Sequence, residues 1–179
     1  MASLTRGAPV SWARMRSAAE ARFRVQAPNS TPRVSKVIAL DAAGEAVVRR
    51  LAEAGWKHAT FFTAASRGEP GDPRHMSLAS ADDTLNDLAG HIRSVTDEVD
   101  TADLVVLVAG PGGHAQAASV IGQACSLRRV MTTAFVVGAT SASENALSKT
   151  LAQLRPWSLM VVIGRSDDYI DDMMTALRA

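Results

Sequence analysis

The sequence contains one cysteine, Cys125, among its 179 residues. A single thiol can build neither a disulfide within the chain nor a metal site of several thiolates, which favours a reducing compartment. Long hydrophobic runs are missing as well: the aliphatic run at residues 104–109 is the length of a strand, far short of the roughly 18 residues that suggest a membrane span. The basic N-terminus lacks an apolar stretch of signal-peptide length. We therefore expect a cytoplasmic protein with no membrane span.

A strong net charge is also lacking, because the formal balance is +1 at pH 7. This balance offers no argument for nucleic acid binding, and we expect no nucleic-acid partner. The charge is nevertheless uneven: six arginines and one glutamate in residues 1–35 give this segment +5 and leave −4 for the rest. With 47% hydrophobic and 21% charged residues, the composition predicts a packed core.

A breaker cluster of Pro, Asn, Ser and Thr at residues 28–32 marks a boundary. It separates a basic N-terminal arm, residues 1–33, from a single α/β domain, residues 34–179. Two interpretations of the arm stay open: a mobile tail, or a basic amphipathic element that touches an anionic surface.

From residue 34 onward the chain alternates strand-like and helix-like segments. The predicted strands are residues 34–40, 59–64, 104–109, 132–137 and 159–163, and the predicted helices are residues 44–54, 82–96, 113–126, 143–154 and 167–177. The strands are almost continuously apolar, so helices should cover both faces. We predict a three-layer α/β fold with an open parallel sheet of about five strands in the order 2-1-3-4-5.

Several local signals set the expected helix ends. Ser80 with Asp83, and Ser141 with Glu144, resemble capping boxes, and Gly55 is a candidate helix stop. Residues 66–79 form an unusually long connection, either a functional flap or an eroded strand.

The predicted strand order reverses between the first and third strands, which is where open α/β sheets bind ligands. The loops at this point are residues 41–44 and 110–114, and the second leaves a strand through glycines to enter a helix, a geometry that suits a phosphate. The candidate ligand-binding residues are Asp41, Gly44, Gly110, Gly112, Gly113 and His114. The alternative is a tight turn with no ligand. The dinucleotide fingerprint and the P-loop motif are both absent, and Asp41 and Glu45 would repel a pyrophosphate.

No residue set points to a particular reaction, so whether the chain is an enzyme stays open. Cys125 lies among apolar helix residues, which predicts a buried thiol. Four acidic residues begin the last helix, Asp167, Asp168, Asp171 and Asp172. Complementing the helix dipole accounts for them, with magnesium binding as the alternative, and we assign no metal site.

Three stretches resemble the nucleotide-binding half of the tubulin/FtsZ superfamily. They are K-V-I-A-L at 36–40 followed by A-V-V-R-R-L at 46–51 and A-G at 54–55, then T-A-D-L-V-V-L-V-A-G at 101–110 with A-A-S-V-I at 117–121, and finally residues 151–163 with D-D at 167–168. The resemblance runs from about residue 34 to the end. The family's glycine-rich first loop and G-G-T-G-T-G signature are replaced here by residues 41–45 and 112–116.

This resemblance implies a diverged relative that keeps the sheet and the anion crevice, with GTP, GDP or another nucleotide as the implied ligand. It also implies no GTPase activity of its own, because the family's central helix and activation domain have no counterpart in this sequence. The leading hypothesis is a domain that binds a nucleotide or phosphate ligand and acts as a homo-oligomer or through a protein partner. The alternatives are a Rossmann-like enzyme or enzyme subunit that binds an adenine-containing cofactor, and a ligand-free scaffold.

Overall fold

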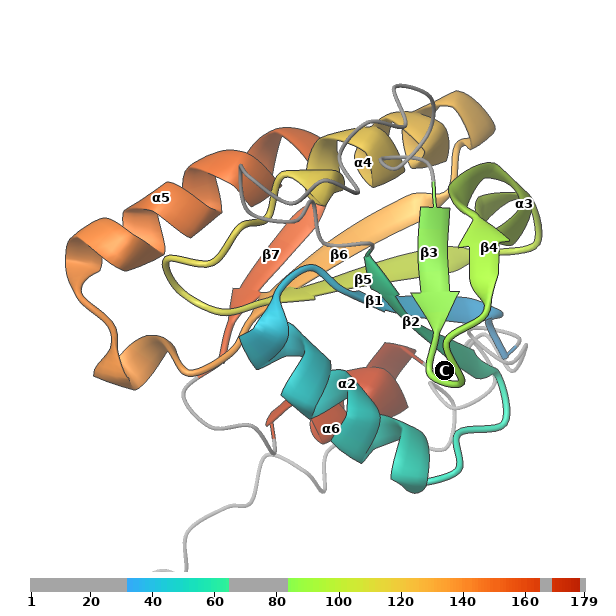
Figure 1. Cartoon of the computed structure of the whole chain (residues 1–179), viewed down its shortest axis with the longest axis horizontal. Helices are drawn as coiled ribbons and strands as arrows, with labels where there is room; N and C mark the ends of the chain where they lie inside the picture. The colour runs from blue at the N-terminus through green and yellow to red at the C-terminus, as the bar shows by residue number, and fades with distance from the viewer. Residues whose placement is uncertain (1–31, 65–83, 165–168, 178–179) are drawn as a thin grey trace, which may run out of the picture. The chain divides into compact units, whose positions relative to one another are not determined.

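The computed structural model describes residues 32–64, 84–164 and 169–177. Within them, seven strands form one mixed sheet in the order β4-β3-β2-β1-β5-β6-β7 (Figure 1). The strands are β1 (Ser35–Ala39), β2 (Ala59–Ala64), β3 (Thr84–Asp87), β4 (Ile92–Ser94), β5 (Leu104–Ala109), β6 (Met131–Val136) and β7 (Met160–Ile163). Neighbours from β2 to β7 are parallel, whereas β3 pairs antiparallel with both β2 and β4.

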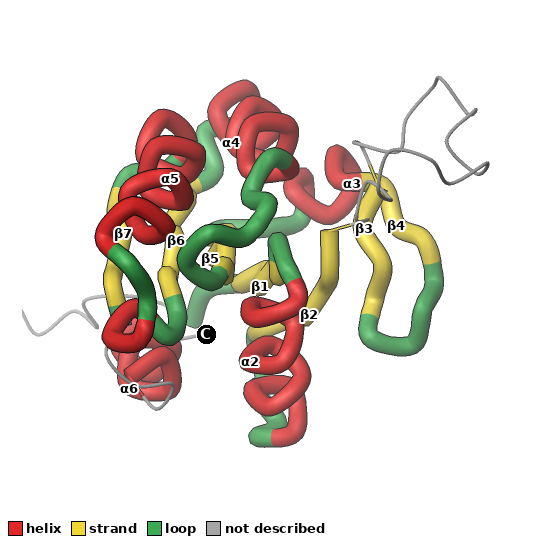
Figure 2. The backbone as a smooth tube through the Cα atoms, turned by 60° about the vertical axis from the view of Figure 1, so that its left-hand side comes forward, coloured by secondary structure: helices red, strands yellow, loops and turns green. Residues whose placement is uncertain are grey.

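Helices cover both faces of the sheet (Figures 1 and 2). On one face lie α2 (Ala42–Glu53) and α6 (Tyr169–Leu177), and on the other α3 (Val95–Asp100), α4 (Ala117–Arg128) and α5 (Glu144–Leu154). Short 3-10 turns, η4 (Ala139–Ser141) and η5 (Arg155–Trp157), flank α5. A separate apolar core fills each side of the sheet, and the central strands β1 and β5 contribute side chains to both cores. This explains why β5 is apolar at every position and why β1 is apolar from Val37 to Ala39.

The predicted α/β class, with helices on both faces, is confirmed. The predicted sheet is wrong in its number of strands and in being purely parallel, because the β3–β4 hairpin extends it beyond β2. The five predicted strands correspond to β1, β2, β5, β6 and β7, which keep their expected order within the larger sheet.

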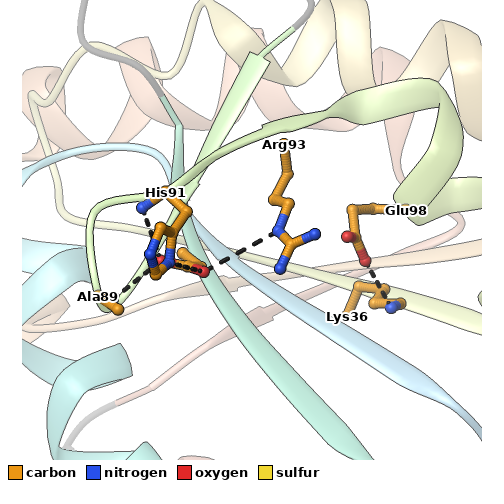
Figure 3. A network of polar contacts seen from close by, with 6 residues as sticks. Lys36, Ala89, His91, Arg93 and Glu98 are labelled. Carbon is orange, nitrogen blue, oxygen red and sulfur yellow. Dashed lines mark hydrogen bonds and ion pairs between the residues drawn. The ribbon is translucent and has the colours of Figure 1, made fainter.

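The predicted helix at residues 82–96 is also wrong, because residues 84–94 form the β3–β4 hairpin. The turn is closed by Asp87, whose Oδ1 accepts hydrogen bonds from the backbone N–H groups of Ala89 (2.9 Å) and His91 (2.8 Å), as Figure 3 shows. These bonds, led by that from His91, lower the pKa of the Asp87 carboxyl group. Gly90 takes the positive φ of 89° that the turn requires.

The helix ends follow local signals, although not all of those expected. The cap of α5 is Ser143 instead of Ser141, and its hydroxyl accepts from the N–H of Ala146 (3.2 Å). After α2, Gly55 has φ 71° and stops the helix as predicted. The Ser80 capping box, the connection at 66–79 and the arm up to residue 31 lie outside the described residues.

An ion pair joins the sheet to α3. Lys36 Nζ on β1 lies 2.7 Å from Glu98 Oε2 (Figure 3). The same nitrogen lies 5.7 Å from the centre of the Phe62 ring. The two side chains are only 9% and 18% exposed, so water solvates neither charge fully. Each charge therefore depends on the other for its stabilisation.

We expect Glu98→Ala to lower the free energy of unfolding by about 2–3 kcal/mol, because Lys36 then keeps a poorly solvated charge without its partner. The double variant Lys36→Met with Glu98→Leu should recover most of this loss, since neither charge remains to be desolvated. Urea unfolding measures both values. A single variant as stable as the parent protein would contradict this account.

Candidate functional site

The two predicted ligand loops meet at the carboxyl ends of β1 and β5. Asp41 follows β1 and caps α2: its Oδ1 accepts a hydrogen bond from the N–H of Gly44 (2.8 Å). The same carboxylate reaches across to the turn after β5, where the N–H of Gly110 lies 3.1 Å from Oδ1 and 2.9 Å from Oδ2. The structure thus brings Asp41, Gly44 and Gly110 together, at the strand reversal where they were expected.

The glycines of these loops allow a close approach of the backbone. A Cβ on Gly44 would overlap the carbonyl oxygen of Val108 in β5, and a Cβ on Gly110 would lie 2.7 Å from the Cβ of Ala43. A Cβ on Gly113 would overlap Oδ2 of Asp41. Close packing of one loop against the other therefore explains why these three positions are glycine. A ligand is not needed to explain them.

Side chains of helix α5 form hydrogen bonds with further backbone groups of the glycine turn. The N–H of Gly112 donates to Thr150 Oγ1 (2.8 Å), and that hydroxyl donates in turn to the carbonyl oxygen of Gly110 (3.1 Å). The N–H of Ala115, just before α4, donates to Gln153 Oε1 (2.8 Å). Thr150 and Gln153 were not predicted, because they lie about forty positions further along the chain. The signal for Thr150 was weak: it is a threonine beside the leucines on the buried face of α5.

His114 is exposed, and within the described part of the chain no hydrogen bond or ion pair connects it to Asp41 or the glycine amides. It therefore stands apart from the polar cluster formed by Asp41, Gly44, Gly110, Gly112, Thr150 and Gln153, which we call the β1–β5 crevice. In this crevice the N–H groups of Gly44, Gly110 and Gly112 already donate hydrogen bonds to oxygen atoms of the protein's own side chains.

The Asp41 carboxylate accepts hydrogen bonds at two places, from the N–H of Gly44 in the first turn of α2 and from the N–H of Gly110 in the turn after β5. An anion at a helix N-terminus is normally held by backbone N–H groups, and at the start of α2 the N–H of Gly44 donates to a carboxylate of the chain. A phosphate would have to displace this carboxylate and then face its negative charge. The amides of Gly44 and Gly110 are thus already hydrogen-bonded to the chain itself.

The other candidate chemical groups have structural partners or lie elsewhere. Cys125 is buried, as predicted, and burial raises the pKa of its thiol, which disfavours the thiolate. Asp171 in α6 forms an ion pair with Arg50 of α2 (3.2 Å), whereas Asp167 and Asp168 lie outside the described residues. Among the residues that the structure describes, no group of three or more His, Cys, Asp or Glu side chains could hold a metal ion.

Two further surface features lie away from the crevice. A groove of about 250 Å³ between α3 and α4 is lined in part by Val95, Val120 and Leu127 and shares no residue with the crevice. At one end of the sheet, β7 pairs with β6 alone among the strands that the structure describes, and it exposes Met160 and Ile163, which are 43% and 44% accessible.

The fold places this chain in the α/β class with a mixed, doubly wound sheet. No protein-family model matches the chain, and a search of the curated proteins finds no match either. The resemblance to the tubulin/FtsZ superfamily therefore stays a prediction. Within the described residues, every helix is too short or too polar to cross a membrane.

Proposed function

We propose that this chain is an association domain, which acts by binding a protein surface without using a nucleotide. The observation that carries the proposal is the Asp41 carboxylate, which accepts from the amides of Gly44 and Gly110 where a phosphate would bind. Of the three functions that the sequence leaves open, this corresponds to the scaffold, combined with the self-association or partner binding of the leading hypothesis.

The cost of opening the crevice argues against a nucleotide ligand. Binding a phosphate at the Gly110 amide would break the hydrogen bonds that tie the start of α2 to the turn after β5. Hydrogen bonds to a charged group contribute about 1.5–3 kcal/mol each, and the ligand would have to offset this loss before gaining any affinity. The exposed apolar edge at β7 supports the association half of the proposal, because such surfaces usually mark interaction sites.

A ligand screen tests the proposal. We expect GTP, ATP, NAD and coenzyme A at millimolar concentration to leave the melting temperature of the full chain unchanged, because the anion position is filled. A functional site would behave differently: at a ligand concentration of 100 Kd, binding adds about 2.7 kcal/mol, which shifts the melting temperature by several degrees.

The Asp41→Gly variant is the matched control for this screen. It removes the carboxylate but keeps the glycine amides, so inorganic phosphate should stabilise the variant and not the parent chain. A dose-dependent stabilisation of the parent chain by GTP would overturn the proposal in favour of the nucleotide-binding hypothesis. Stabilisation by NAD or coenzyme A would favour the Rossmann-like enzyme instead.

A further inference from the structure

We infer that the partner bound at β7 is a second copy of this chain, and that the two β7 strands pair antiparallel to join their sheets into one. The inference rests on the proposed function and names its partner. It follows from the chemistry of the sheet edges, the surface on both faces of β7, and the charges at the two ends of α5.

The β7 edge lacks the features that keep an edge strand from pairing. Residues 158–164 read S-L-M-V-V-I-G and contain no charge and no proline. Leu159 is 81% exposed, just before the strand begins. The opposite edge of the sheet differs, because β4 carries Arg93 and follows His91. Charged side chains are a common protection of exposed edges, and β7 is the edge without them.

Apolar surface continues on both faces of the sheet beside this edge. Successive residues of a strand point to opposite faces, so Met160 lies on the face of Val162 and Ile163 on that of Val161. Val162 packs in the core under α6 and Val161 in the core under α5, yet Met160 and Ile163 stay about two-fifths exposed. A partner that adds a strand here would cover both residues at once.

The strand is complementary to itself. In an antiparallel pair centred on Val161, Val161 lies opposite Val161 of the second copy, Met160 opposite Val162 and Leu159 opposite Ile163, so opposite side chains share a face of the joined sheet. Every cross-strand pair is then apolar, and the two-fold arrangement presents the same residues from both copies.

The charges of α5 also fit a second copy. Glu144 begins α5 and Arg155 follows its last residue. Both side chains are exposed, and neither has an ion-pair partner among the described residues. An antiparallel β7 pair places α5 and its copy on the same face of the joined sheet, running in opposite directions. Glu144 of each copy then lies at the same end as Arg155 of the other, and this opposite-charge arrangement favours a second copy over an unrelated partner.

The first experiment measures the association of the full chain by analytical ultracentrifugation at micromolar concentrations. We expect a dimer. The double variant Met160→Lys with Ile163→Lys should weaken it by at least about tenfold in Kd, because each lysine would be desolvated beside an apolar strand. The control is Ile92→Lys on β4, which is 73% exposed at the opposite edge and should leave the dimer unchanged.

Charge exchange tests whether the partner is a second copy. Glu144→Arg and Arg155→Glu should each weaken the dimer several-fold, because each variant places like charges at both ends of the paired helices. The variant that carries both substitutions should recover the parent affinity, since opposite charges face each other again. Circular dichroism of each variant reports whether it is folded.

A measurement on the unmodified chain keeps the test independent of any variant. Hydrogen exchange of the β7 amides that point away from β6 should slow as the protein concentration rises, because only pairing with a second strand protects them. A chain that stays monomeric, a dimer unaffected by the lysines at residues 160 and 163, or outward-pointing β7 amides whose exchange does not depend on concentration would each overturn the inference. None of these results changes the ligand screen, so failure of the dimer and failure of the proposed function are distinguishable.

Discussion

Asp41→Ala is expected to lower the free energy of unfolding by about 3–4 kcal/mol. The substitution removes the cap of α2, a loss of about 1–2 kcal/mol. It also leaves the N–H of Gly110 without the carboxylate that it contacts through both oxygens, which adds about 1.5–3 kcal/mol for a bond to a charged acceptor. Chemical denaturation at neutral pH measures the total.

Ser143→Ala is the matched control, because Ser143 caps α5 in the same way. The Ser143 hydroxyl accepts a hydrogen bond from the nearby N–H of Ala146 and, among the described residues, forms no hydrogen bond with a strand. We therefore expect the free energy of unfolding to fall by about 1 kcal/mol. The difference between the two variants estimates the contribution of the link from β1 to β5. Equal losses would show that the contact between Asp41 and Gly110 adds nothing to stability.

Gly44→Ala is expected to lower the free energy of unfolding by about 3 kcal/mol. The new Cβ would overlap the carbonyl oxygen of Val108, which belongs to the backbone of the central strand β5 and cannot move aside as a side chain would. The sign of the result is informative, because alanine in place of glycine within an ordinary helix stabilises by about 0.5–1 kcal/mol. A gain of stability would mean that α2 does not approach β5 this closely.

The control for Gly44→Ala is Ala46→Ser, on the exposed side of α2. It also adds one heavy atom to the helix but at an exposed position, so the change should stay within about 0.5 kcal/mol. Thermal and urea unfolding of both variants make the comparison. A control as destabilised as Gly44→Ala would point to a general sensitivity of the helix and not to the contact with Val108.

The main strands and most helices were predictable from local patterns. Residues 104–109 are apolar at every position, and the structure places them as β5 in the centre of the sheet. Asp41 and the glycines after β5 were also predicted to lie near each other, because the carboxyl ends of neighbouring parallel strands meet at one edge. The strands depend on residues close together in the sequence, and the meeting of the two loops follows from the predicted order of the strands.

The hairpin at residues 84–94 was not predicted. Its apolar residues Leu85 and Leu88 are three positions apart, which also fits a helix, and Asp87 and Gly90 fit both a turn and a polar helix face. Pairing of β3 with β2 decided the outcome, and that partner strand lies some twenty residues earlier in the chain. Local preference is a weak guide where strand pairing can override it.

Local patterns along the chain were enough to predict the α/β class, the apolar strands and the position of the glycine turn. The hydrogen-bond partners of the glycine amides depend instead on how the chain folds. The carboxylate of Asp41 and the amide of Gly110 are 69 positions apart, and the oxygens of Thr150 and Gln153 come from a third segment. A glycine turn that awaits an anion and one already held by the chain share the same local sequence. They differ only in which distant side chains folding brings to the turn.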